Sequence, residues 1–217
     1  MFSAFPPYLR FPPIPSDSLR PTVHPVRYAV WIEGGSSNIS VDTCAVSDVS
    51  GGIRIGRGAP LPAPPSSSSS SSGAGRTHGI TVRNSHITGG ALVYREAAGV
   101  LSQNADRVTL YRNDISFFNH VGISMGWVWG ASPVAGRSNA ILSNHVHHVG
   151  NNDLSDLGGI YLLGSQPNTT VNGNIVHHSD PYFLYGHGIY LDEGSSNIDI
   201  SQVLEYTCWG CNGWQSE

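Results

Sequence analysis

Acidic side chains beside two glycine-containing runs are the groups of this sequence best suited to acid–base chemistry. Asp156 precedes the run Gly158-Gly-Ile-Tyr161, and the pair Asp192 and Glu193 follows the run Gly188-Ile-Tyr-Leu191. Two carboxyl groups, one protonated and one ionised, can act as a general acid and as a base or nucleophile across a bond. An aspartate ahead of Gly-Ser-Ser-Asn is also typical of a turn in which the side chain bonds its own backbone. Catalysis and turn formation both remain open for these acids.

Histidines are the second recurring feature. The pairs His147-His148 and His177-His178 are 30 residues apart, so we expect them to stack on adjacent turns of a repeat with one ring of each pair facing outward. Such rings can form structural hydrogen-bonded ladders or bind polar ligands. No compact metal-binding motif such as His-Glu-x-x-His occurs in the sequence. The sequence therefore predicts no metal site and no cofactor.

Short strand-like segments recur along the chain and would position these residues. Runs that start with glycine and isoleucine begin at Gly52, Gly122, Gly159 and Gly188. A second kind of segment occurs at Val82–Ile87, Val108–Ile115, Ile141–Val146 and Val171–Val176. Within the last three segments or at their turns lie Asn113, Asn144 and Asn174, 31 and 30 residues apart. These segments repeat with an irregular period, are rich in β-branched residues and show no helical periodicity. They indicate an all-β protein, a parallel β-solenoid with ladders of asparagine.

Composition divides the chain into three kinds of segment. Residues 1–26 are rich in proline and form an expected irregular leader, and residues 27–217 form the expected β-helix domain. A flexible Pro/Ser-rich insertion at 59–75 interrupts that domain. Because solenoids need capped ends and no capping helix is evident, we expect an incomplete or truncated solenoid.

Charge and hydropathy exclude several classes of function. The net charge is −4 and only 12% of residues are charged, so we expect no nucleic-acid partner. The sequence has no lysine, which excludes a lysine nucleophile or base. No apolar run of about 18 residues occurs, so we expect no membrane span. No secretory signal is visible at the start of the sequence. We expect a monomer.

Register decides whether Asp156 and Asp192 can meet. Aligning Gly159 with Gly188 places Tyr161 beside Tyr190, with both rings outward. The two aspartates then lie seven positions apart, about 23 Å on straight strands at roughly 3.3 Å per residue. They meet only if the loop 150–157 folds back over the strands. Alternative partners for Asp192 are Asp153, Asp180 and Glu193.

Four motifs of the second half closely resemble right-handed parallel β-helix proteins with the pectin-lyase-like fold. They are Gly122-Ile-Ser-Met-Gly-Trp-Val-Trp-Gly130, Asn144-His-Val-His-His-Val-Gly150, Leu154-Ser-Asp-Leu-Gly-Gly-Ile-Tyr161 and Gly188-Ile-Tyr-Leu-Asp-Glu-Gly-Ser-Ser-Asn197. The resemblance runs from about residue 27 to 207. Within the group, the chain is similar to the glycoside hydrolase family that contains α-L-fucosidase and xylanase activities. It implies an extracellular protein, although the sequence shows no signal peptide.

The resemblance implies a glycoside hydrolase that cleaves a plant- or algal-type polysaccharide or oligosaccharide with Asp156 and Asp192 as its carboxylate pair. Tyr161 and Tyr190, with Trp127 and Trp129 one coil earlier, could form an aromatic platform for pyranose rings. The tryptophans could instead cover the insertion or pack against another domain. The expected substrate-binding residues are Glu193, His187, Tyr161, Tyr190, Trp127, His148 and His178.

Two other functions would also suit a β-helix. A non-catalytic β-helix that binds carbohydrate or acts at a surface would agree with the short chain and the Pro/Ser-rich insertion. A polysaccharide lyase commonly needs a lysine or arginine base and often Ca²⁺ held by several acids. Because the sequence lacks lysine and a dense acidic cluster, a lyase is the least favoured function.

Overall fold

The structure, a computed structural model, describes residues 28–58, 76–130 and 134–208. The predicted leader at 1–26 and the predicted insertion at 59–75 lie outside these residues. All regular elements in the described ranges are β-strands, arranged in three parallel sheets of six strands. No helix long and apolar enough to span a membrane is found among the described residues.

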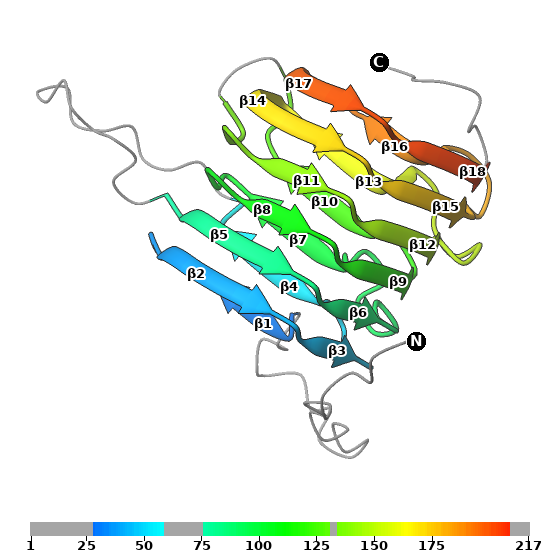
Figure 1. Cartoon of the computed structure of the whole chain (residues 1–217). Coiled ribbons are helices and arrows are strands. Elements are labelled where there is room, and N and C mark those ends of the chain that lie inside the picture. Colours follow the sequence, from blue (N-terminus) through cyan, green and yellow to red (C-terminus); the bar gives the residue numbers. More distant parts are fainter. Residues whose placement is uncertain (1–27, 59–75, 131–133, 209–217) are drawn as a thin grey trace, which may run out of the picture.

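The chain passes through the three sheets in turn and then repeats (Figure 1). Sheet A contains β1 (Val30–Ile32), β4 (Ile53–Gly56), β7 (Val100–Gln103), β10 (Ile123–Gly126), β13 (Leu157–Leu163) and β16 (Gly186–Leu191). Sheet B contains β2 (Ser37–Asp42), β5 (His78–Arg83), β8 (Thr109–Tyr111), β11 (Ala140–Leu142), β14 (Ser165–Asn172) and β17 (Ser196–Ser201). Sheet C contains β3 (Ala45–Ser47), β6 (His86–Thr88), β9 (Asp114–Phe118), β12 (His145–Val149), β15 (Ile175–Ser179) and β18 (Leu204–Cys208).

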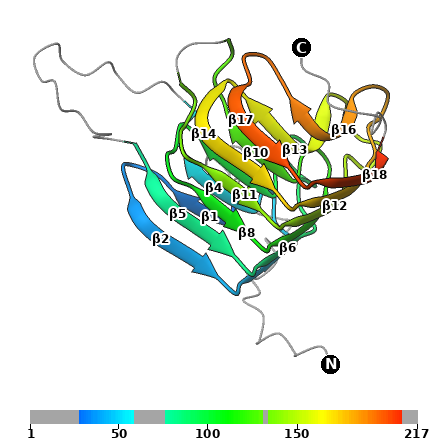
Figure 2. The same cartoon turned by 45° about the horizontal axis from the view of Figure 1, so that its top comes forward.

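This arrangement confirms the predicted fold class, an all-β parallel β-helix. Figure 2 shows the sheets wrapping around a common interior, with each strand directly above its counterpart in the preceding coil. The predicted second segments, however, are each two strands rather than one. Val108–Ile115 breaks between β8 and β9 at Arg112, which has a left-handed φ of 54°, and Ser143 (φ 52°) breaks the next coil in the same way. This bend creates the third sheet.

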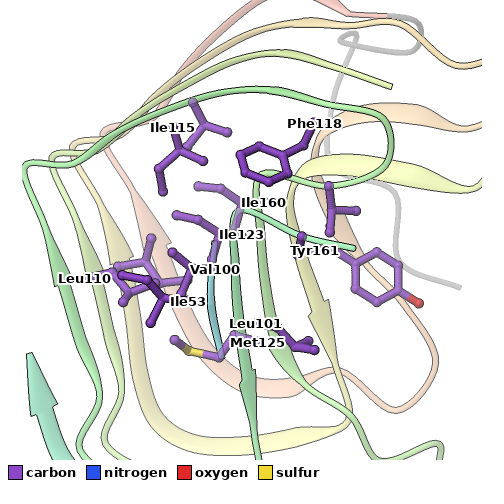
Figure 3. Close-up of a cluster of buried hydrophobic side chains, with 14 of the residues drawn as sticks. Ile53, Val100, Leu101, Leu110, Ile115, Phe118, Ile123, Met125, Ile160 and Tyr161 are labelled. Atoms are coloured by element: carbon purple, nitrogen blue, oxygen red, sulfur yellow. The ribbon is translucent and has the colours of Figure 1, made fainter. Parts of the chain in front are cut away.

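Rows of apolar side chains fill the interior of the helix. The row Ile53, Val100, Ile123 and Ile160 lies in register across sheet A, and Ile115 and Phe118 of sheet C face it (Figure 3). All six side chains are fully buried. Area removed from water by such rows is the main stabilising term of the fold.

The recurring glycines are explained by the same interior packing. A Cβ added to Gly122 would lie 2.3 Å from Cγ1 of Val146, and one added to Gly159 would lie 2.3 Å from Cγ1 of Val176. These glycines therefore let the valine row of sheet C reach across the start of sheet A. The same requirement recurs at Gly52 and Gly99, where an added Cβ would lie 2.6 Å from Cγ2 of Ile87 and 2.5 Å from Cγ2 of Ile115, and it accounts for the repeated glycine.

Candidate functional site

A cleft of about 230 Å³ lies over the outer face of sheet A. The outward row of this sheet is Leu101, Ser124, Tyr161 and Tyr190, in register across β7, β10, β13 and β16. The small Ser124 leaves a depression between Leu101 and Tyr161, and all three residues line the cleft. Aromatic walls are supplied by Tyr28, Trp127 and Trp129.

The two predicted catalytic aspartates are held by a crossed pair of tyrosines. The Tyr190 hydroxyl donates to Asp156 Oδ1 at 2.9 Å, and the Tyr161 hydroxyl donates to Asp192 Oδ2. The tyrosine rings meet edge to face with centroids 5.2 Å apart. Each coil thus supplies the tyrosine that binds the aspartate of its neighbour, and the two carboxylates lie at opposite ends of one tyrosine pair.

Asp192 is not acting as an ordinary turn former. The turn after β16 closes through the backbone, because the Ser195 N–H donates to the Asp192 carbonyl oxygen at 2.9 Å. The carboxylate itself is turned toward Tyr161. Burial and this carboxylate together raise the pKa of Tyr161 far above its usual value, so the phenol stays protonated and remains a donor.

Asp156 occupies the mouth of the cleft. Its carboxylate is on an exposed residue with a left-handed φ of 59°, directly before β13. Asp156 lines the cleft, whereas Asp192 reaches it through Tyr161. The loop 150–157 therefore brings Asp156 within hydrogen-bonding reach of the neighbouring coil's tyrosine, although the strands place the two aspartates seven positions apart.

Two residues that sequence reasoning missed, Glu96 and His120, also line the cleft. His120 Nε2 lies 3.2 Å from the backbone oxygen of Asp156. Burial lowers the pKa of His120, against the opposing effects of Asp156 and Glu96, so its ring is neutral near pH 7. Both residues sit in the loops that enter sheet A, where no repeat or motif marks them.

The predicted binding residues divide between sheet A with its cleft and sheet C, where only His148 and His178 lie. Trp127 and Tyr161 line the cleft, and Tyr190 is bonded to Asp156. His187 is buried against Tyr190, with ring centroids 4.8 Å apart. Glu193 is exposed in the turn that follows Asp192.

The expected tyrosine platform is corrected by the structure. Tyr161 and Tyr190 point outward in register as predicted, but they are only 9% and 4% exposed. Their rings pack edge to face, so their flat faces are not presented to solvent as a stacking surface. Trp129, which is 55% exposed, is the side chain at the cleft that offers an open ring face.

His148 and His178 lie on the outer face of sheet C, away from the cleft on sheet A. The expectation that only one ring of each histidine pair faces outward is wrong. His148 and His178 both have a left-handed φ of 52°, which turns two successive side chains to the same face. As a result His147 stacks on His177 at 5.0 Å, and His148 stacks on His178 at 4.4 Å.

The alternative partner acids make other contacts. Asp153 forms an ion pair with Arg95 in the neighbouring loop. Asp180 acts electrostatically on His148, at the end of sheet C. Neither residue lines the cleft or is bonded to the tyrosine pair. Glu96, which lines the cleft, and Asp192, which is bonded to Tyr161, are therefore the acids best placed to work with Asp156.

Side chains that could hold a metal ion gather on sheet C. Two groups of three have their ligand atoms within 4.8 Å of one another. The first group is Asp114, His145 and His147, and the second is His148, His177 and His178. Although burial alone would raise the pKa of Asp114, the hydrogen bonds from His147 and His86 outweigh it and hold that pKa well below its usual value. Burial and neighbouring imidazoles lower the pKa of His177 to about 4.

Comparison with known proteins agrees with this architecture. One solved structure, titled "Glycoside hydrolase", is similar with a TM-score of 0.70 and 25% sequence identity. The similarity covers 82% of this chain and 31% of that chain, so the present chain spans about a third of that protein's length. No curated protein sequence matches the chain significantly.

A protein-family profile matches the sequence over residues 22–203, and its description is right handed beta helix region. This match spans most of the three parallel sheets described above. The chain belongs to the family of right-handed β-helix proteins.

Proposed function

We propose that this chain is a carbohydrate-active protein of the glycoside hydrolase type, with its active site in the cleft over sheet A. The observation that carries the proposal is the crossed pair of tyrosine hydroxyls that fixes the Asp156 and Asp192 carboxylates beside an aromatic cleft. Hydrolysis of a glycosidic bond needs two positioned carboxyl groups. Support also comes from the similar structure, which is titled a glycoside hydrolase.

The cleft suits a sugar chain better than a compact apolar ligand. Its volume of about 230 Å³ is small, and its lining combines Trp127, Trp129 and Tyr28 with polar groups. Aromatic faces pack against the apolar faces of sugar rings, and the polar groups can bond hydroxyls. The cleft would hold a short section of a polysaccharide or oligosaccharide while the rest lies along the solenoid.

In the proposed reaction, Asp156 and a second carboxyl group act from the two sides of the scissile bond. Asp192 is the first choice of partner, because the tyrosine pair connects the two residues. Glu96 is the second choice, because it lines the cleft together with Asp156. His120 holds the backbone of Asp156 and is neutral near pH 7, so it is a positioning residue.

Reducing-sugar release from a panel of plant and algal polysaccharides tests the proposal. We expect D156N and D192N each to lower kcat by roughly 10²- to 10⁴-fold, the usual contribution of a catalytic acid or base. D199N is the matched control, since Asp199 is an exposed aspartate of β17 in sheet B. Circular dichroism should show that all three variants keep the fold.

The variant E96Q identifies which carboxyl group works together with Asp156. Loss of activity in D156N and E96Q with full activity in D192N would assign the partner role to Glu96. Full activity in D156N would overturn the proposed site. Binding of an oligosaccharide in the cleft without any turnover by the wild-type chain would instead support a non-catalytic binding protein.

A further inference from the structure

The outer face of sheet C carries a dense patch of imidazole rings that the proposed hydrolysis does not use. This histidine patch is formed by His86, Asp114, His145, His147, His148, His177 and His178. It spans four neighbouring strands, β6, β9, β12 and β15. Two further aromatic rings pack on the patch: Phe117 of β9 stacks on His148 at 5.0 Å, and Tyr206 of β18 stacks on His177 at 4.6 Å.

Asp114 is the anchor of the patch. His147 Nε2 donates to its Oδ1 at 2.9 Å, and His145 Nδ1 lies 3.4 Å from the same oxygen. His86 Nδ1 donates to the other oxygen, Oδ2, at 3.2 Å. The carboxylate is therefore fixed on both sides, with two imidazole nitrogens of the next coil gathered at one of its oxygens.

The remaining rings are joined to this anchor by nitrogen–nitrogen contacts. His145 Nε2 lies 2.8 Å from His177 Nε2, and His147 Nδ1 lies 2.7 Å from His148 Nδ1. His177 Nδ1 in turn lies 2.6 Å from His178 Nδ1. Each contact needs one N–H and one lone pair, since two N–H groups or two lone pairs would repel at this distance.

Asp114 fixes the direction of the contact between His147 and His148. Because the carboxylate only accepts, His147 points its single N–H group at Asp114 and turns a lone pair toward His148. His148 must then donate to His147, which leaves a lone pair on Nε2 of His148. The contacts of His177 with His145 and His178 each pair one N–H group with one lone pair. The rings of His148 and His178 are stacked nearly parallel, at an angle of 10°.

We propose that the histidine patch binds divalent transition-metal ions of the class that prefers imidazole, such as Zn²⁺. One triad is Asp114, His145 and His147, and the other is His148, His177 and His178. Tetrahedral zinc bonded to N and O at about 2.0–2.2 Å brings its ligand atoms to about 3.4 Å from one another. The separations of Asp114 Oδ1 from His147 Nε2 and His145 Nδ1, 2.9 and 3.4 Å, lie close to that value. An ion held there takes the place of the proton between His147 Nε2 and Asp114, which moves to the other ring nitrogen or is released.

The types of ligand, and the hydrogen bond that orients the carboxylate ligand, also fit a transition-metal ion that prefers imidazole. Each triad supplies three protein ligands and leaves a fourth position for water, as in zinc sites with an open coordination position. His86 holds the second oxygen of Asp114, a support that commonly orients carboxylate ligands. Oxygen-preferring ions such as Mg²⁺ and Ca²⁺ are not matched by five imidazoles and one carboxylate.

The asparagine ladder on the neighbouring bend shows what a purely structural ladder looks like in this protein. Asn144 uses its amide oxygen for Asn113 and its amide nitrogen for Leu110 O and Asn174, so its side chain is satisfied within the fold. The histidine patch differs, because its rings lie on the outer face of sheet C and contact one another through imidazole nitrogens. An ion in the first triad would join β9 to β12 and an ion in the second would join β12 to β15, so the two ions together would tie three successive coils.

Calorimetric titration of the metal-free full chain with Zn²⁺ tests the proposal. We expect two ions per wild-type chain, one in H145N, one in H178N and none in the double variant, since each residue belongs to a single triad. H78N is the matched control, because His78 lies on sheet B with its Nδ1 3.0 Å from the Arg76 carbonyl oxygen. It should bind as many ions as the wild type.

Thermal unfolding gives a second readout that does not depend on enzymatic activity. Zn²⁺ should raise the melting temperature of the wild type and of H78N, and should leave that of the double variant unchanged. Melting without metal shows whether each variant is folded. A wild-type chain that takes up no Zn²⁺, or a double variant that takes up as much as the wild type, would overturn the proposal.

Discussion

At the scale of single residues, the crossed tyrosines are the feature that links two separate aspartates into one candidate site. Tyr161 and Asp156 belong to one coil, and Tyr190 and Asp192 belong to the next. Each hydroxyl donates to the carboxylate of the other coil, so neither aspartate can move without its partner's tyrosine. A charged acceptor makes these hydrogen bonds stronger than neutral ones.

Removing one hydroxyl tests that role without removing the ring. We expect Y190F to lower kcat roughly tenfold or more, because a hydrogen bond to a charged group contributes about 1.5–3 kcal/mol. KM should change little if the ring keeps its packing. Steady-state kinetics on the substrate found for the wild type gives both constants.

Y161F should behave in the same way through Asp192. Y182F is the matched control, since Tyr182 is 74% exposed in the loop before β16. If Y190F and Y161F were as active as Y182F, the tyrosine pair would have a packing role only.

Part of this site was predictable from sequence. The register of Tyr161 with Tyr190 was predicted from the glycine alignment and is confirmed. Asp156 and Asp192 were predicted as catalytic residues from the resemblance of their motifs, and that role stays a prediction. Glu96 and His120 were not predicted, because their loops have no period and their positions depend on how each loop packs over sheet A. The approach of Asp156 to Tyr190 also depends on loop conformation, which strand register does not determine.

At the scale of elements, the buried asparagines hold successive coils together at the bend between sheets B and C. Asn144 accepts from the backbone N–H of Asn113 at 3.0 Å and donates to Asn174 Oδ1 at 3.0 Å. Its amide also donates to the Leu110 carbonyl oxygen at 2.9 Å. The sequence predicted this ladder from the spacing of the three residues, and the structure confirms it.

N144A should destabilise the protein by about 3–4 kcal/mol, since each buried polar group left without a partner costs about 1–3 kcal/mol. Urea unfolding followed by circular dichroism measures the change. N172A is the matched control, because the half-buried Asn172 makes one side-chain hydrogen bond, to Ser201 Oγ at 2.8 Å. Equal losses in the two variants would contradict a special role for the ladder.

The third sheet shows where the sequence pattern was insufficient. One strand was predicted over Val108–Ile115 from its apolar and β-branched residues, although Ile115 is out of phase with Val108 and Leu110. Only the left-handed conformation of Arg112 separates β8 from β9. Left-handed φ is uncommon for arginine, so Arg112 itself does not signal the break, whereas Asn84 and Gly173 occupy the equivalent bends of two other coils. The same conformation at His148 and His178 turned both rings of each histidine pair outward.

At the scale of the whole molecule, the solenoid separates its two candidate sites onto different sheets. The cleft occupies the outer face of sheet A, and the histidine patch occupies the outer face of sheet C. The interior rows are shared by all coils, whereas outward residues differ from coil to coil. A β-helix can therefore carry two unrelated polar sites with little change to its core.

Glu205 is an exception to the apolar interior. The interior row of sheet C is Val46, Ile87, Ile115, Val146 and Val176, and Glu205 of β18 continues it in register. Its side chain packs on the backbone of sheet A, since a Cβ added to Gly188 would lie 2.6 Å from Glu205 Cδ. Burial raises the pKa of Glu205 above its usual value, with only a backbone hydrogen bond at Ile189 opposing it.

This shift makes stability depend on pH in a defined direction. A carboxyl group whose folded-state pKa is raised binds its proton more tightly in the folded protein than in the unfolded one. Its contribution is therefore fully present below the unfolded value of 4.5 and is lost as the pH rises through the folded-state pKa. E205Q cannot ionise and keeps a similar shape, so it should be more stable than the wild type at pH 7.

Urea unfolding of the wild type and E205Q across this pH range measures the difference. The gap should be largest at neutral pH and should close below about pH 4.5, because the glutamate is then protonated in both the folded and the unfolded states. Stability curves that stay parallel at all pH values would contradict the burial of this carboxyl group. A gap that closes in acid would instead show that the interior row at β18 tolerates a polar side chain only in its neutral form.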